Sequence, residues 1–453
     1  MPEAAKIFTE EIIYVHPYTP FSNQLEHIPM SLPALINRLP YKIKGFFAEE
    51  LADKTIRKTK IVIIDLHWFL SLYGAYILCK HIKKVNKNAI IIAGGITASE
   101  FYRILIEKFN IDFIIRGDAE IPLRALVYNL MNDLDLNQVP NIAGKDNFST
   151  NWDYCLNQKD LDENNYMDID FFPSFRSFVY GIHNSGNGMM IPSIMYPCMM
   201  VVRGCPRIYK CSYCAGGMHD QFCLFRRENL TRSSTRVNDD LTELENNSNI
   251  KFVYFTQDLI NLYQEEDIDI VLNKKFQLKA GLELFNIPKY QNLEKFLNAF
   301  EGGTIGFCLA IHYSQNDDIG DIALLIDLIR LVKNKNYFPV LFYSERFSKT
   351  NMRYRDSLKT IVTATDCKLL EISRWWINYP LPLPDGTADE KYFGYFLYES
   401  YMQERNFNKD NYSIKMNYRF KIKKDFYLLK NYNNINKLLK KLNIECIRPE
   451  SEI

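Results

Sequence analysis

The chain has 453 residues, of which 47% are hydrophobic and 24% are charged, and its formal net charge is +1. This length exceeds one ordinary hydrophobic core and predicts two or three domains. The balanced charge lacks the basic excess that is typical of nucleic-acid-binding proteins. The longest apolar stretch, 188–202, is broken by Pro192 and Pro197 and falls short of the roughly 18 residues of a membrane span, so we expect no transmembrane helix.

The N-terminus and the cysteines indicate the compartment. No apolar core follows a basic start, so we expect no secretory signal, a cytoplasmic location and no disulfides. In a reducing compartment, ten cysteines are typical of free thiols together with a metal or cluster site. Three of them, Cys205, Cys211 and Cys214, lie close together and are the first candidates for such a site.

Residues 11–131 alternate between short β-branched runs and helical stretches. The pattern predicts strands at 12–15, 41–46, 60–65, 89–93 and 113–116, and helices at 31–39, 71–84, 98–109 and 121–131. Strands and helices in alternation form a parallel sheet with crossover helices. We therefore expect an α/β protein whose first domain, 1–145, is Rossmann-like.

Polar residues follow three of these strands, at the sheet edge where ligands bind in such folds. The three loops contain Asp65, Leu66, His67 and Trp68; Gly94, Gly95, Ile96 and Thr97; and Arg116, Gly117, Asp118, Ala119 and Glu120. The two glycines would let the backbone approach a flat ligand, and the hydroxyls at 97 and 99 would donate hydrogen bonds. A Gly-Gly pair after a buried strand also fits a plain turn into a helix, so these residues alone leave ligand contact open.

This series of motifs resembles the N-terminal domain of the cobalamin-dependent radical S-adenosylmethionine enzymes. The resemblance rests on Asp-Leu-His-Trp at 65–68, Gly-Ala at 74–75, Ala-Gly-Gly at 93–95, Ile-Arg-Gly-Asp at 115–118 and Val-Pro-Asn at 139–141. It implies that cobalamin contacts Asp65, His67, Trp68, Ser71, Gly94, Gly95, Thr97, Arg116, Gly117 and Asp118.

We do not assign His67 as a cobalt ligand. Cobalt-binding histidines of cobalamin domains lie in an Asp-x-His-x-x-Gly motif after the first strand, whereas His67 follows the third predicted strand and residue 70 is Leu. We expect His67 to line the corrin or close the loop, leaving the lower face of the cobalt without a histidine. Capping of the following helix by its ring nitrogen fits the sequence equally well.

Residues 145–190 are polar and irregular, and we interpret 146–190 as a linker or crossover. An apolar strand then leads to Arg203, Gly204 and Cys205. Soft thiolates suit zinc and iron–sulfur clusters alike. Structural zinc normally takes four protein ligands, whereas a cluster held by three cysteines keeps one iron open for a substrate or cofactor. Because three cysteines lie close together after a strand that ends in Arg-Gly, we favour an iron–sulfur cluster over zinc.

The pattern Arg-Gly-Cys-x5-Cys-x2-Cys is similar to the cluster motif of the radical S-adenosylmethionine enzymes. The resemblance implies a 4Fe–4S cluster on Cys205, Cys211 and Cys214, and S-adenosylmethionine contacts by Tyr213, Gly216 and Gly217. The usual spacing is Cys-x3-Cys-x2-Cys, so the longer loop at 206–210 has to bulge away from the cluster. The alternative is a zinc site whose fourth ligand is Cys198, His219 or Cys223.

Further strands predicted at 251–258, 278–283 and 306–312 alternate with helices and favour a partial TIM-type barrel over 191–400. The polar residues at their ends are Gln257, Asp258, Glu283, His312 and Ser314. The resemblance implies that Gln257, Asp258 and Glu283 contact S-adenosylmethionine, although closing a turn or capping a helix explains each one equally well.

The C-terminal part contains two further features. Segments 380–387 and 391–395 resemble a stretch that follows the barrel in the subgroup with the Asp-Leu-His-Trp signature. In the extension, 401–453, basic and aromatic residues alternate, which would suit nucleic acid. A solvated β-ribbon followed by a short amphipathic helix at 435–442 explains the same pattern, and we favour it.

The resemblance implies a methyltransferase that acts on an unactivated carbon of a small molecule or natural-product precursor. A 5′-deoxyadenosyl radical would abstract a hydrogen atom, and methylcobalamin would supply the methyl group. A flavodoxin or ferredoxin is the implied electron donor, and we expect neither membrane nor nucleic acid as partner. Rearrangement, ring formation and oxidation by the same cofactors are alternatives, as is a non-catalytic scaffold that holds zinc or a structural cluster.

Overall fold

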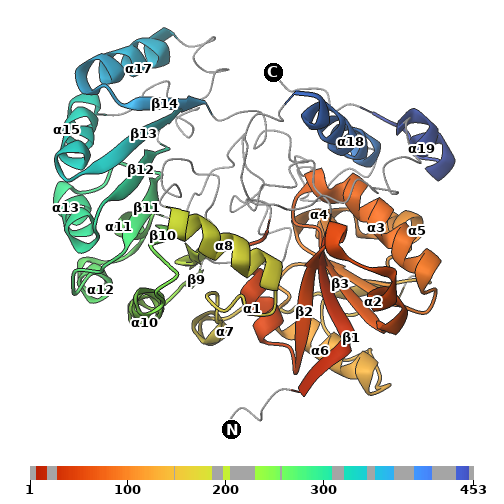
Figure 1. Ribbon diagram of the computed structural model, residues 1–453. Helices are drawn as coiled ribbons and strands as arrows, with labels where there is room; N and C mark the ends of the chain where they lie inside the picture. Colours follow the sequence, from red (N-terminus) through yellow and green to blue (C-terminus); the bar gives the residue numbers. More distant parts are fainter. Residues whose placement is uncertain are drawn as a thin grey trace.

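The computed structural model describes residues 7–17, 28–146, 148–185, 197–204, 230–255, 258–308, 321–343, 352–371, 392–410 and 435–447. Two six-stranded sheets, one in each half of the chain, organise these residues (Figure 1). The predicted α/β fold class is confirmed. Within the described ranges, none of the helices has the length and apolar character needed to cross a membrane.

The first sheet has the strand order β2-β1-β3-β4-β5-β6. Its strands are β1 (Ile7–His16), β2 (Tyr41–Phe47), β3 (Ile61–Asp65), β4 (Ile90–Gly94), β5 (Phe113–Ile115) and β6 (Ile142–Gly144). All neighbours are parallel except β5 and β6, which are antiparallel. The five predicted strands are present. Strand β6, with three residues, was not predicted from the sequence.

Helices cover both faces of this sheet, as a parallel sheet requires. They are α1 (Leu32–Asn37), α2 (Asp53–Lys58), α3 (Leu72–Val85), α4 (Ile96–Glu100), α5 (Tyr102–Phe109) and α6 (Glu120–Met131). The single helix predicted at 98–109 is divided into α4 and α5 at Phe101, whose backbone leaves the helical conformation (φ −107°, ψ 29°).

The stretch interpreted as an irregular linker contains two helices, α7 (Gln158–Glu163) and α8 (Pro173–Ser185). Helix α7 buries only Leu161, so its sequence has no apolar periodicity. Helix α8 lies between the two sheets (Figure 1). It packs against β2 on one side, and on the other its His183 stacks on Phe252 of the second sheet with ring centroids 3.7 Å apart.

The second sheet is entirely parallel, and its strands follow chain order: β14-β13-β12-β11-β10-β7. They are β7 (Cys198–Met199), β10 (Phe252–Phe255), β11 (Lys279–Leu284), β12 (Gly303–Phe307), β13 (Tyr337–Tyr343) and β14 (Lys368–Glu371). The connecting helices are α10 (Ser234–Asn246), α11 (Leu259–Leu262), α12 (Glu265–Val271), α13 (Tyr290–Ala299), α15 (Ile322–Asn334) and α17 (Met352–Thr365). This in-order arrangement with helices outside is the topology of a partial βα barrel.

A short antiparallel pair, β8 (Val202–Arg203) and β9 (Leu230–Thr231), forms a separate two-stranded sheet.

The last two helices, α18 (Phe393–Asp410) and α19 (Ile435–Leu442), return to the first sheet (Figure 1). They share one buried core with it, in which Phe396 packs on Phe69 with ring centroids 5.2 Å apart. Ser400 accepts a hydrogen bond from the Tyr73 amide (3.0 Å) and donates one to the Leu70 carbonyl (2.6 Å). Helix α19 agrees with the predicted amphipathic helix, whereas the predicted ribbon lies outside the described residues.

Candidate cofactor-binding site

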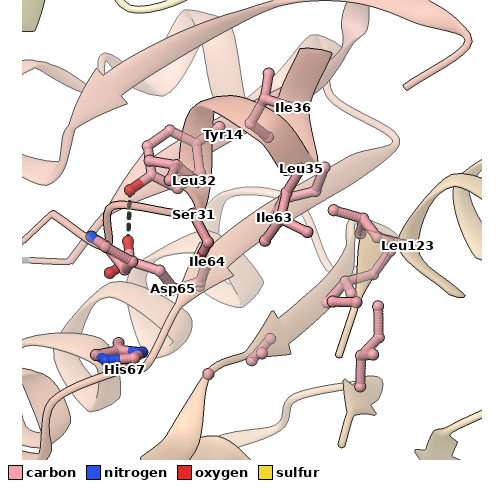
Figure 2. Close-up of a pocket in the computed structure, with 17 residues that line it drawn as sticks. Tyr14, Ser31, Leu32, Leu35, Ile36, Ile63, Ile64, Asp65, His67 and Leu123 are labelled. Carbon is pink, nitrogen blue, oxygen red and sulfur yellow. Dashed lines mark hydrogen bonds between the residues drawn. The ribbon is translucent and has the colours of Figure 1, made fainter. Parts of the chain in front are cut away.

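A pocket opens at the carboxyl edge of the first sheet, between α1 and the ends of β1, β3 and β4 (Figure 2). Its wall is mainly apolar and includes Leu32, Leu35, Ile36, Ile63, Ile92, Ile115 and Leu123. The predicted residues Asp65, His67, Gly94 and Gly95 all line it. Four of the proposed cobalamin contacts thus come from two separate loops and meet in one cavity.

Asp65 is the buried carboxylate of this pocket, with 8% of its surface exposed. Its Oδ1 accepts a hydrogen bond from the Tyr14 hydroxyl (2.5 Å) and lies 2.9 Å from Nδ1 of His16, while burial and the Asp65 charge raise the pKa of Tyr14 and keep it a donor (Figure 2). Its Oδ2 is buried and has no hydrogen-bond partner among the residues that the structure describes.

Tyr14 and His16 were not among the residues predicted from the sequence. They lie two residues apart near the end of β1, and side chains at that spacing point to the same face of a strand. In the sequence they look like ordinary residues of an apolar strand. Only the parallel pairing of β1 with β3, which sets Val15 beside Ile64, brings them to Asp65.

His67 carries no charge near neutral pH. Burial and the positive charge of Arg203 lower the pKa of its imidazole to about 4. Its ring makes an edge contact with Trp68, at 4.7 Å between centroids, and its backbone carbonyl accepts a hydrogen bond from the Thr97 hydroxyl (3.0 Å). A neutral imidazole suits a residue in the wall of the pocket, and the expectation that it lines the corrin or closes the loop stays a prediction.

The two glycines after β4 differ in what they do. Gly95 has a φ of +110°, and a Cβ there would come within 2.7 Å of the backbone of Leu66 and His67. Gly95 therefore allows the two loops to pack tightly. A Cβ on Gly94 would meet nothing closer than the Ile115 carbonyl at 3.8 Å, so this residue leaves open space at the pocket.

The remaining predicted cobalamin contacts lie next to the pocket but not on its wall: Trp68, Ser71, Thr97, Arg116, Gly117 and Asp118. The guanidinium of Arg116 stacks on Trp152 (3.8 Å from the ring centroid) and Tyr102 (4.6 Å). Gly117 donates its amide hydrogen to the Ser99 hydroxyl (3.1 Å). Arg116 and Gly117 thus connect their loop to neighbouring segments of the chain.

Asp118 joins the two halves of the molecule. Its Oδ1 accepts hydrogen bonds from Nε (3.2 Å) and Nη2 (3.1 Å) of Arg203, and its Oδ2 accepts one from the Leu156 amide (2.8 Å). Nη2 of Arg203 also lies 3.7 Å from the buried Glu120. Arg203 precedes Cys205 by two residues, so the strand leading into the cysteine motif is attached to the loop after β5.

The candidate cluster and several S-adenosylmethionine contacts lie outside the described residues: Cys205, Cys211, Cys214, Tyr213, Gly216, Gly217 and Gln257. In the part of the chain that is described, no group of three or more His, Cys, Asp or Glu side chains could hold a metal ion. Of the alternative zinc ligands, Cys198 is described and is buried in β7. His219 and Cys223 are outside the described ranges.

Glu283 and Tyr254 form a buried pair on the second sheet. The Tyr254 hydroxyl donates a hydrogen bond to Oε1 of Glu283 (2.7 Å), and burial raises the pKa of Glu283 to about 7. Glycines stand beside them, since a Cβ on Gly281 would strike the ring of Tyr254 and one on Gly306 would lie 2.6 Å from the ring of Phe342. Tyr254 therefore fills the space that a larger residue at 281 would occupy, and Phe342 does the same at 306.

Asp258 fastens a loop next to this pair. Its Oδ2 accepts hydrogen bonds from Asn261 (2.7 Å) and from the amides of Phe285 (2.9 Å) and Asn286 (3.2 Å). Its Oδ1 is buried with no hydrogen-bond partner in the described ranges, and burial raises its pKa to about 6. The turn-closing role considered for Asp258 is thus realised, while one acceptor stays available for a ligand.

Comparison with known proteins gives relatives in sequence and in structure. No family profile matches the chain. It is 24% identical over 250 residues to the uncharacterized methyltransferase PH0819 of Pyrococcus horikoshii, an alignment that covers 54% of this chain and 50% of that protein. The chain thus spans about half the length of this curated relative.

Two solved enzymes have a similar fold. TsrM of Kitasatospora setae, a radical S-adenosylmethionine methyltransferase solved with cobalamin and a [4Fe–4S] cluster, matches with a TM-score of 0.53 and 12% identity over 78% of this chain and 73% of its own. OxsB, a cobalamin-dependent S-adenosylmethionine radical enzyme solved with aqua-cobalamin, matches with a TM-score of 0.54 and 14% identity over 87% of this chain and 56% of its own. Both belong to the class that the motifs of this sequence resemble.

Proposed function

We propose that the chain is a cobalamin-dependent radical S-adenosylmethionine enzyme that transfers a methyl group to an unactivated carbon of a small molecule or natural-product precursor. The observation that carries this proposal is the ion pair of Arg203 with Asp118, 3.1 Å long. It holds Arg203, two residues before Cys205, beside the loop after β5, which would bring the two proposed cofactor sites close to each other. A mechanism that uses both cofactors on one substrate needs this arrangement.

The chemistry of the pocket residues suits cobalamin. A corrin is a broad, mostly apolar ring with carboxamides at its rim, and the pocket offers apolar walls, open space at Gly94 and a spare acceptor on Asp65. Bound there, cobalamin would supply the methyl group for transfer. The contributions of the chain are to hold the ring against β3 and β4, to keep His67 neutral beside it and to exclude water with the apolar wall.

The second sheet provides acceptors suited to S-adenosylmethionine. Glu283 and Oδ1 of Asp258, which has no partner among the described residues, can accept hydrogen bonds from an ammonium or from ribose hydroxyls. The cluster proposed on Cys205, Cys211 and Cys214 would supply the electron that cleaves S-adenosylmethionine. The electron itself would come from a flavodoxin or ferredoxin.

The test is anaerobic reconstitution with iron and sulfide. We expect about four irons per chain and reductive cleavage of S-adenosylmethionine to 5′-deoxyadenosine. Replacement of Cys205, Cys211 or Cys214 by Ala should abolish both, whereas the matched control Cys446→Ser, at an exposed thiol, should change neither. Bound zinc without cleavage would overturn the radical chemistry.

Two further measurements test cobalamin and methyl transfer. Protein purified after incubation with hydroxocobalamin should keep a corrin absorption spectrum. With methyl-labelled S-adenosylmethionine under reducing conditions, the label should appear on the bound cobalamin. Cleavage to 5′-deoxyadenosine without any labelled cobalamin would favour rearrangement, ring formation or oxidation over methyl transfer.

A further inference from the structure

The two oxygens of the Asp65 carboxylate have different surroundings. Oδ1 is held by the Tyr14 hydroxyl and by His16, whereas Oδ2 is buried and has no partner within the described part of the chain. A buried acceptor without a hydrogen bond is costly. Because Asp65 lines the pocket, a donor group of a bound ligand can supply the missing bond.

The environment of Asp65 determines the chemical class of the ligand group that can bind to it. An ionised carboxylate has acceptors only, so its partner has to donate a hydrogen atom. The surrounding wall is apolar, and a second negative charge brought into such a site would be repelled strongly. Nearby His67 is neutral and does not offset that charge.

We propose that Oδ2 of Asp65 accepts a hydrogen bond from a carboxamide on the rim of the corrin, and that Asp65 thereby makes the pocket select amidated corrinoids over their carboxylate counterparts. This inference rests on the proposed binding of cobalamin. Tyr14 and His16 act as positioning residues, because they hold Oδ1 and leave Oδ2 without a partner in the described part of the chain. A site built around a hydrogen bond rejects an analogue that cannot form it.

The test compares two corrinoids that both lack the nucleotide tail: cobinamide, with carboxamides at the rim, and cobyrinic acid, with carboxylates. Each competes against hydroxocobalamin on the full chain, and displacement is followed by absorption. We expect the wild-type protein to bind cobinamide at least 10-fold more tightly than cobyrinic acid.

Asp65→Asn keeps the shape of the side chain. Its carbonyl can still accept from Tyr14, and its amide then presents a donor to the pocket. We expect binding of cobinamide to weaken about 10- to 100-fold and the preference for it to disappear or reverse, since one lost hydrogen bond to a buried charge has this size. Asp112→Asn is the matched control, because Asp112 pairs with Lys83 and Lys145 away from the pocket and should leave the preference intact.

The outcomes separate this inference from the proposed function. If the wild-type protein binds no hydroxocobalamin, the proposed cobalamin site is wrong, and the inference falls with it. If it binds hydroxocobalamin but holds cobyrinic acid within about twofold of cobinamide, only the inference fails. An unchanged preference in folded Asp65→Asn protein would overturn it as well. Should that variant not fold, a wild-type protein without the preference would still overturn the inference.

Discussion

The two sheets of this protein prepare their sites in different ways. At the edge of the first sheet, hydrogen bonds connect each loop to the next: Thr97 donates to the carbonyl of His67 (3.0 Å), and the amide of Gly117 donates to Ser99 (3.1 Å). The second sheet instead has a buried polar pair, Glu283 with Tyr254, in which burial raises the pKa of the carboxyl group. The shape of the first site therefore depends mainly on the backbone geometry of its loops. The hydrogen bonding of the second site depends mainly on the protonation state of Glu283.

The largest effect that we expect is a loss of stability when the backbone geometry of the first site is disturbed. Gly95→Val should destabilise the protein by about 4 kcal/mol, because the residue combines a positive φ with a backbone contact of 2.7 Å. The measurement is urea unfolding. Gly94→Ala is the control and should cost less than about 1 kcal/mol. Equal losses of unfolding free energy in the two variants would mean that the tight packing of the loops at Gly95 does not determine the backbone geometry at this edge of the sheet.

The second prediction concerns the protonation of Glu283. Its pKa in the folded protein is raised from 4.5 to about 7, so its contribution to stability is complete below pH 4.5 and is lost as the pH rises towards 7. A shift of this size corresponds to about 3 kcal/mol. From pH 4.5 to 8, Glu283→Gln should therefore gain about that much stability relative to the wild-type protein, as followed by thermal or urea unfolding at each pH. A pH-independent difference between the two proteins would contradict it.

A smaller effect is expected at the contact between the two halves. Arg203→Gln removes the ion pair with Asp118 and should cost about 2 kcal/mol, less than for a fully buried pair because Arg203 is 24% exposed. Arg38→Gln, which breaks the comparably buried Arg38–Asp160 pair, should cost a similar amount. Only Arg203→Gln should also slow cleavage of S-adenosylmethionine, about 10-fold, at unchanged iron content. Equal rates of S-adenosylmethionine cleavage in the two variants would contradict a positioning role for Arg203.

The smallest prediction concerns the return of the chain to the first domain. Ser400→Ala removes the two hydrogen bonds to Leu70 and Tyr73 and should cost about 1 kcal/mol. The loss should appear as faster hydrogen exchange in α18 and α3, with α13 and α15 unaffected. Uniform acceleration over all four helices would show that Ser400 acts on global stability instead.

The sequence predicted the first sheet well, and for a clear reason. Strands β3 and β4 are runs of Ile and Val buried on both faces, and such runs are distinctive even without structural information. The residues that follow them, Asp65 and Gly94, could therefore be assigned to one edge. Residues brought together by pairing between strands could not be assigned, as Tyr14 and His16 show.

Other parts of the structure were missed for different reasons. Phe175 and Val179 of α8 have the spacing of a helix, but the polar residues around them concealed it. The bond between Arg203 and Asp118 joins residues far apart in the chain, and no spacing rule predicts such a contact. The cysteine motif itself stays a prediction, because its residues lie outside the described ranges.

Helices α18 and α19 change how the molecule can be divided. Phe393, Phe396 and Leu438 are buried in the same core as Ile64 and Leu78, so the beginning and the end of the chain build one hydrophobic unit. The barrel is then in effect an insertion within that unit. A chain ended after residue 145 would leave the apolar face covered by α18 open to water and would be prone to aggregate. Cutting the protein at the apparent domain boundary would split a domain.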